Sequence, residues 1–229
     1  MAERLPTSFN HFASFRLTPE YWDLDPAEGT DLRRRWTAAL EPLAGGVHHY
    51  RTYPTQDASD FLVWSAVDGG DPQIPAKFFN AFAAATRPFR AFAEPVDMRW
   101  GFTRSSSYST ARSKQEIDPF HTREQPYLVM YPFTKTAEWY LLDRSTRQEM
   151  MNAHMRIGKS YEDITQLLLY SVGLQDQEFV VVYETDDLAR FSQLVADLRA
   201  TEARAYTLKD TPVYVGVYRP VADLDGLWP

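Results

Sequence analysis

The stretch 61-FLVWSAVD-68 has a counterpart later in the chain, 179-FVVVYETD-186. Both stretches begin with phenylalanine, continue with β-branched and aromatic residues and end in aspartate, as buried strands do. Each is followed by a segment with aromatic and Leu/Ala residues at helical spacing. Internal similarity of this kind indicates a duplicated architecture. We therefore expect one structural unit to be used twice.

Working outward from these strands, the apolar periodicity predicts the same order of elements in each half. In the first half we expect strands and helices, in the order β-α-β-β-α-β, at 9–17, 30–44, 47–54, 60–67, 75–93 and 96–104. In the second half the same order falls at 126–133, 145–159, 164–172, 178–185, 187–201 and 211–218. This order is ferredoxin-like.

Local signals refine the ends of these elements. Pro88 is expected to break the helix in which it lies, and Pro132 to stop the strand that ends at Tyr131. Asp143 and Ser145 both signal a helix start, and Ser145 has Gln148 three residues later as a capping box.

A lone four-stranded sheet leaves one face uncovered, so the two halves should share a core. The fold class we predict is α+β, with duplicated ferredoxin-like halves forming a barrel of the dimeric α+β type. We expect a structural N-terminal half at 1–104, a polar connection at 105–125 and a C-terminal half at 126–229. The connection is either a surface linker or a functional lid. The barrel interior or its mouth is the expected ligand site.

Composition excludes several classes of protein. The net charge of -7 argues against a nucleic-acid partner, because phosphate binding needs a basic field. The absence of cysteine excludes disulfides and thiolate metal sites. The sequence contains no apolar run of about 18 residues and no signal-peptide core, so we expect a cytoplasmic protein without a membrane span.

His154 is the histidine most suited to a chemical role. In 150-MMNAHMRIGKSY-161 it projects from an apolar helical stripe with Met150 and Ile157. A buried imidazole without a partner costs on the order of 1 kcal/mol or more, so something must satisfy it. The partner is either a carbonyl or carboxylate, or a metal on one nitrogen with a carboxylate on the other. Glu202, expected in the last helix, is a candidate for that carboxylate.

Three further residues allow two readings each. Tyr131 is a redox phenol or an ordinary strand aromatic, and Lys135 is a carboxylate anchor or a solvated turn lysine. Gln166 is an amide facing the barrel interior, where it would need a partner, or a polar residue of an edge strand.

Together these residues resemble the chlorite dismutase family, which includes the coproheme decarboxylases. The resemblance covers about residues 126 to 218 and is only architectural before that. Its motifs keep their order and near-equal spacing: Tyr131-Pro132-x-x-Lys135, Trp139, His154, Ile157-Gly158, Tyr161, Gln166, Gly173-Leu174, Asp176-x-Glu178 and Leu198-Arg199-x-x-Glu202.

The resemblance implies an iron porphyrin, haem b or coproheme, bound in the C-terminal half with His154 as the axial iron ligand. It also implies that Lys135 and Arg199 hold propionates, that Trp139 contacts the cofactor and that Glu202 lies near the proximal side. Two departures stand out. The segment 135–139 is short, as in chlorite dismutases. The linker arginine that the resemblance expects on a propionate has no single match, and is either Arg112 or Arg123.

The implied reaction depends on two positions. Gln166 matches the distal glutamine of some coproheme decarboxylases, where chlorite dismutases have arginine, and Tyr131 matches the tyrosine that becomes a radical. The resemblance therefore implies hydrogen-peroxide-dependent decarboxylation of two propionates of iron-coproporphyrin III, giving haem b. The alternatives are conversion of chlorite to chloride and oxygen, or haem binding without turnover. Family members are commonly homopentamers, so a homo-oligomer is expected.

Overall fold

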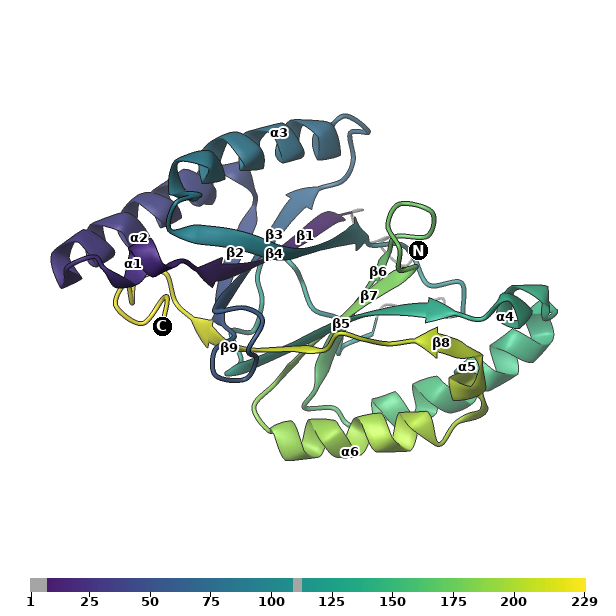
Figure 1. The fold of residues 1–229 in the computed structure, drawn as a ribbon. Coiled ribbons are helices and arrows are strands. Elements are labelled where there is room, and N and C mark those ends of the chain that lie inside the picture. The colour runs from purple at the N-terminus through teal and green to yellow at the C-terminus, as the bar shows by residue number, and fades with distance from the viewer. Residues whose placement is uncertain (1–7, 109–112) are drawn as a thin grey trace.

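Strands β1–β7 and β9 close into an antiparallel barrel in the computed structural model, which describes residues 8–108 and 113–229 (Figure 1). Neighbours run β4-β1-β3-β2 in the first half and β9-β5-β7-β6 in the second, and β2–β9 and β4–β6 join the halves. The strands are β1 (Ser8–Leu17), β2 (Gly46–Arg51), β3 (Phe61–Asp68), β4 (Ala93–Phe102), β5 (Tyr127–Lys135), β6 (Thr165–Tyr170), β7 (Phe179–Thr185) and β9 (Tyr214–Arg219).

Each half carries its two main helices on the outside of the barrel (Figure 1). These are α2 (Pro26–Leu40) and α3 (Ile74–Thr86), then α5 (Arg144–Lys159) and α6 (Leu188–Arg199). Shorter elements are α1 (Pro19–Trp22), α4 (Ala137–Leu141), β8 (Thr207–Lys209) and the 3₁₀ turns η1 (Glu41–Leu43), η2 (Arg87–Phe89) and η3 (Glu202–Tyr206). The predicted duplicated α+β barrel is confirmed.

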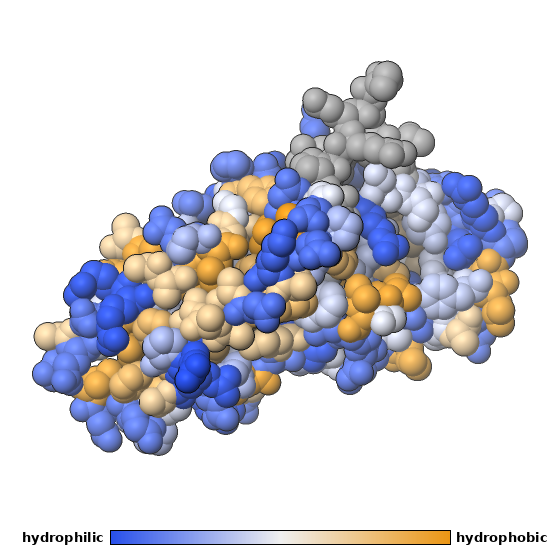
Figure 2. All heavy atoms as spheres, turned by 90° about the horizontal axis from the view of Figure 1, so that it is seen from above, coloured by the Kyte–Doolittle hydropathy of each residue, from blue (hydrophilic) through white to orange (hydrophobic). Residues whose placement is uncertain are grey.

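The surface seen from the α3 side mixes hydrophilic and hydrophobic side chains, with strongly hydrophilic groups at both ends (Figure 2). This mosaic is what a helix layer shows when its apolar stripe faces inward and its other side faces water. Within residues 8–108 and 113–229, the structure contains no helix that is both long and apolar enough to cross a membrane.

Of the predicted signals at element ends, Asp143 and Pro88 are confirmed, whereas the Ser145 capping box and the stop at Pro132 are wrong. The side chain of Asp143, and not a Ser145 capping box, caps α5 by accepting from the Thr146 N–H at 2.9 Å. Strand β5 continues through Pro132 to Lys135, because pairing with β9 has already ended at Met130 and no ladder bond needs the missing N–H. Helix α3 stops before Pro88, as predicted.

The barrel interior is filled with side chains, so the expectation of a ligand site there is wrong. Alternate residues of each strand point inward, among them Leu128, Leu167 and Val182, all at most 3% exposed. Met130 and Trp64 pack in the same cluster. A small barrel closed by large apolar side chains is a packed core, and leaves a ligand the outer faces.

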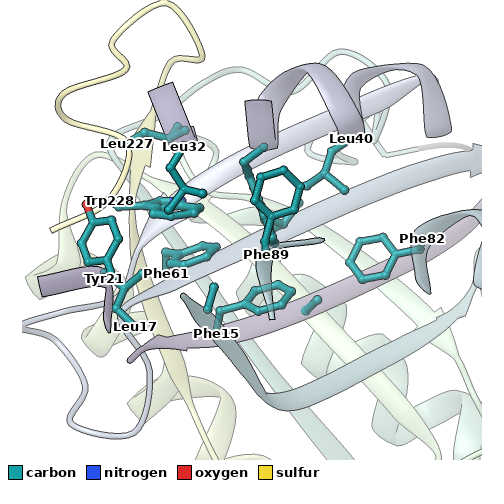
Figure 3. Packing of buried hydrophobic residues seen from close by; sticks show 14 of the residues in the cluster. Phe15, Leu17, Tyr21, Leu32, Leu40, Phe61, Phe82, Phe89, Leu227 and Trp228 are labelled. Carbon is teal, nitrogen blue, oxygen red and sulfur yellow. The ribbon is translucent and has the colours of Figure 1, made fainter. Parts of the chain in front are cut away.

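An aromatic cluster fills the space between the first-half sheet and its helices (Figure 3). Phe15 and Phe61 stack across neighbouring strands with ring centroids 5.1 Å apart. Trp36 of α2 meets both rings edge-on, and Trp228 from the end of the chain stacks on Phe61 at 4.6 Å. All of these rings are at most 1% exposed, so nearly all of their apolar surface is buried in this half.

Part of the connection between the halves packs against the barrel, around Ile117 and Pro119. Ile117 is 3% exposed and joins the barrel core. The backbone beside it extends the sheet: Ile117 N–H donates to the Gln166 carbonyl at 3.0 Å, and Gln166 N–H donates to the Gln115 carbonyl at 2.7 Å. A Cβ at Gly46 would lie 2.6 Å from the Pro119 carbonyl, so glycine permits this close approach.

Candidate functional site

The outer face of the second-half sheet forms the floor of the candidate site. Gln166 lies on this face and is exposed, so the expectation that it faces the barrel interior is wrong. Its neighbour Leu167 takes the interior position, as strand alternation requires. Leu168 lies opposite Val181, which in turn lies opposite Tyr131 on β5. Strand register therefore places Tyr131 and Gln166 on one surface.

Helix α5 covers this floor without filling the space beneath it. None of its residues is buried, whereas α2 in the other half buries Leu32, Trp36 and Leu40. A Cβ at Gly158, on the inner side of α5, would meet no atom within 4 Å among the described residues. On the floor, Leu168 remains 38% exposed, which is unusual for an apolar strand residue under a helix. The pattern indicates open space between α5 and β6.

His154 lies on the inner side of α5 and is half-buried. Its Nδ1 atom is buried and has no hydrogen-bond partner within the described ranges. Burial, together with the smaller effect of the nearby positive charge of Lys135, lowers the pKa of His154 to about 4. The imidazole is therefore neutral at pH 7, as a metal ligand must be. Among residues 8–108 and 113–229, no carbonyl or carboxylate pairs with Nδ1, which was the first of the two readings of this residue.

Lys135 and Trp139 lie together at the end of β5. The Lys135 Nζ is 4.5 Å from the centre of the Trp139 ring and donates to the Ala203 carbonyl at 3.2 Å. Burial, followed by the charge of Arg204, lowers the pKa of Lys135 to about 8. Trp139 is only 4% exposed. Lys135 is therefore a partly buried, fixed cation and not a solvated turn lysine.

Tyr131 is half-buried and shares a side-chain hydrogen bond with Tyr183, whose ring stacks on it at 6.1 Å. Burial raises the pKa of Tyr131, so the phenol is protonated at neutral pH. Arg199 and Arg204 oppose this shift by favouring the phenolate. The Tyr131 phenol is therefore neutral, and it lies beside a second phenol, that of Tyr183.

The other predicted residues are more dispersed. Arg199 ends α6, is half-exposed and pairs with Asp210 at 3.0 Å. Glu202 lies in η3 and not in the last helix; it is exposed and contacts no ring nitrogen of His154 in the described chain. Arg123 N–H donates to Glu184 at 3.2 Å, and its guanidinium donates to the Lys114 carbonyl at 3.2 Å. Arg112 lies outside the described residues.

Sequence reasoning missed two residues beside this space. Arg147 precedes His154 by two helical turns on the same side of α5, a spacing visible in the sequence. Gln115 was hidden in the connection, and its side-chain amide donates to the carbonyls of Gly158, Tyr161 and Ile164 at 2.7–3.1 Å. No sequence signal marks Gln115, because its partners are backbone atoms.

The chain is similar in sequence to proteins of two named activities. The chain is 29% identical to the coproheme decarboxylase of Mycolicibacterium smegmatis over 160 residues, 69% of this chain and 66% of that protein. It is 24% identical to the chlorite dismutase of Ideonella dechloratans over 230 residues, 96% of this chain and 79% of that protein. The chain thus spans just under two thirds of the first relative and more of the second.

The fold has close counterparts among solved structures. The chlorite dismutase of Candidatus Nitrospira defluvii in complex with imidazole matches with a TM-score of 0.80, covering 95% of this chain and 93% of that chain at 21% identity. The family model described as chlorite dismutase matches residues 31–219, which is most of the sequence. The chain belongs to the chlorite dismutase family.

Proposed function

We propose that this chain binds an iron porphyrin between α5 and the outer face of β5, β7 and β6, with His154 as the axial iron ligand. The observation that carries the proposal is the neutral imidazole of His154, with an unpaired buried nitrogen, on a helix that buries none of its residues. The half-buried Phe133 and Phe179, stacked at 4.7 Å, offer an apolar surface on the floor. The residues fit such a group.

We propose peroxide-dependent decarboxylation of iron-coproporphyrin III to haem b as the reaction. Each of two propionates loses carbon dioxide and two hydrogens to become a vinyl group, and each hydrogen peroxide is reduced to two water molecules. When bound, the iron porphyrin supplies the peroxide-reacting centre. The relatives named coproheme decarboxylase, including one from Staphylococcus saprophyticus that is 36% identical over 98 residues, support this choice.

The chain's residues then have separate tasks. Tyr131 gives up an electron and its phenolic proton, and as a radical removes a hydrogen from the propionate β-carbon. Lys135 and Arg199 orient carboxylates, which is a positioning role. Trp139 holds Lys135 in place through its ring. Gln166, neutral and exposed to the space beneath α5, faces the peroxide side without a charge.

Chlorite decomposition is the second candidate, because the relative named chlorite dismutase aligns with 96% of this chain. The neutral Gln166 counts against it, since the resemblance predicts an arginine for that chemistry. Oxygen release from chlorite at high turnover without bleaching would favour it over the first.

The decisive experiment is mass spectrometry of the porphyrin after incubation of the protein with coproheme and peroxide. Two successive losses of about 46 mass units are expected, the sum of carbon dioxide and two hydrogens. Tyr131→Phe should bind coproheme and produce neither loss, whereas Tyr127→Phe on the same strand should behave as wild type. Normal haem b formation by Tyr131→Phe would exclude the proposed role of the phenol.

The axial ligand is tested separately by the visible spectrum of the bound ferric porphyrin. His154→Ala should lose the imidazole-ligated spectrum and bind the porphyrin more weakly. An unchanged spectrum would contradict the assignment, whatever reaction the wild-type protein catalyses. Tight binding with no consumption of peroxide or chlorite would identify a haem-binding protein without turnover.

A further inference from the structure

The cations predicted to meet carboxylates already have protein partners. Lys135 Nζ donates to the Ala203 carbonyl and to Thr207 Oγ1 at 3.2 and 3.3 Å. Arg199 and Arg204 both pair with Asp210, at 3.0 and 2.6 Å. A ligand with several carboxylates would have to compete for these groups or share them.

Arg147 differs from these cations. Its Nε is buried and has no hydrogen-bond partner in the described part of the chain, although the residue is half-buried. A guanidinium cannot shed its charge at physiological pH, so a buried unpaired N–H must find an acceptor or remain costly. Burial and a hydrogen bond to Glu178 raise the pKa of Tyr140, and the nearby charge of Arg147 opposes this rise.

The position of Arg147 relates it to the proposed porphyrin site. It lies seven residues before His154 on α5, which is nearly the same helical direction and about 10 Å along the helix axis. The residues between them on this side of the helix, Met150 and Met151, are half-buried and apolar. A flat ligand bound at His154 and resting on these methionines would bring its polar rim to Arg147.

The neighbouring residue fixes the wall of this region. Gln148 donates from Nε2 to the Tyr108 carbonyl at 3.0 Å, which ties the start of the connection to α5. The Tyr108 ring lies 6.5 Å from the Trp139 ring. The start of α5 is therefore anchored one residue after Arg147, and the buried Nε of Arg147 shows that its side chain is not simply a solvated one.

We propose that Arg147 binds a carboxylate of the porphyrin, as a binding residue in addition to Lys135 and Arg199. This inference rests on the proposed function. A guanidinium offers two parallel N–H groups to a carboxylate, which suits a propionate at a fixed angle better than an ammonium does. Arg147 then adds a fixed positive charge for a ligand with several carboxylates, on a chain whose net charge is -7.

The test is equilibrium binding of two iron porphyrins that differ only in charge, iron-coproporphyrin III and its tetramethyl ester, in the same detergent micelles. Arg147→Gln should weaken binding of the acid by about 10-fold or more, as expected for a lost charged hydrogen bond, and leave the ester unaffected. Arg147→Lys should recover only part of the loss. Arg156→Gln, which removes the same charge from the exposed side of α5, is the matched control and should change neither.

The outcomes separate this inference from the function on which it rests. Equal losses for acid and ester would mean that Arg147 supports the helix and not a carboxylate, and equal losses in Arg147→Gln and Arg156→Gln would reduce its role to net charge. Either result overturns the inference. Suppose that Arg147→Gln weakens binding of the acid but not of the ester, and that the wild-type protein with peroxide gives no mass loss. Arg147 then binds a carboxylate, and only the decarboxylase assignment is wrong.

Discussion

The two halves of this molecule share a stacked phenylalanine pair and differ in what lies above it. Phe15 and Phe61 stack at 5.1 Å and an interplanar angle of 14° in the first half, and Phe133 and Phe179 at 4.7 Å and 14° in the second. The first pair is 1% exposed, whereas the second is only partly buried. One scaffold therefore supports a closed core in one half and an open surface in the other.

The covering helix explains the difference. Trp36 and His154 hold the same position relative to the aspartates, Asp25 and Asp143, that cap their helices. In α2 the tryptophan contacts the phenylalanine pair, and Trp228 adds a second ring from the chain's end. In α5 the same position carries an imidazole with an unpaired nitrogen. At equivalent positions, α2 therefore fills the space above the phenylalanine pair with a ring, whereas α5 presents an imidazole nitrogen that has no partner among the described residues.

The largest expected effect is the difference in stability between Trp36→Ala and His154→Ala. Trp36→Ala removes a fully buried ring from a packed cluster and should destabilise the ligand-free protein by about 3–5 kcal/mol. His154→Ala removes a half-buried group that packs poorly, so its effect should stay within about 1 kcal/mol. Urea unfolding of both variants measures the difference.

Phe61→Leu, which reduces the same cluster without emptying it, is the control for Trp36→Ala. Comparable losses of stability in Trp36→Ala and His154→Ala would show that α5 is packed as tightly as α2. The contrast between the halves would then be wrong.

Much of this fold could be predicted because its determinants are local. The period of the apolar residues in 61–68 and 179–186 gave the strands, and Pro88 gave the break after α3. The prediction that Pro132 stops its strand was wrong, because the effect of a proline depends on whether a neighbouring strand needs its N–H. That depends on the tertiary structure and not on the local sequence. The choice of Asp143 over Ser145 as the cap depended on a backbone angle that both residues could adopt.

The candidate site was less predictable than the fold. Alternation correctly put Gln166 and Leu167 on opposite faces, but it could not say which face was interior until the sheet had closed. Glu202 fell outside its expected helix because α6 ends at Arg199. The packing of Trp228 on Phe61 joins residues from opposite ends of the chain, and no periodicity reports such a contact.

A smaller effect is expected in acid, where the buried His49 of the first half should make the protein less stable. Both ring nitrogens of His49 are buried without partners in the described residues, and burial lowers its pKa to about 3. The unfolded chain takes up a proton near pH 6.5 and the folded one does not, so stability is full above pH 6.5 and falls as the pH drops toward 3. His49→Leu should abolish a loss of about 2 kcal/mol between pH 7 and pH 5.

The measurement is the free energy of unfolding at several pH values. His121→Leu serves as the control for replacing a histidine by leucine, because that side chain is 86% exposed. His154 has a higher folded pKa, about 4, so its share of the acid loss should end at a higher pH than that of His49. An unchanged slope in His49→Leu would mean that its ring is hydrated in solution.

The smallest expected effect concerns a glycine in each covering helix. Gly158→Ala in α5 gains helix propensity and meets no described atom within 4 Å, so it should stabilise the ligand-free protein by roughly 0.5–1 kcal/mol. Gly29→Ala in α2 should gain less, because its Cβ would lie 3.3 Å from the guanidinium of Arg33, which is itself held by Tyr21 at 2.8 Å. If the porphyrin occupies the space beneath α5, the added methyl of Gly158→Ala should also weaken its binding, while Gly29→Ala should not. A stabilised Gly158→Ala protein that binds the porphyrin as tightly as wild type would place the ligand away from this turn of the helix, and would limit the open region to the part of α5 before His154.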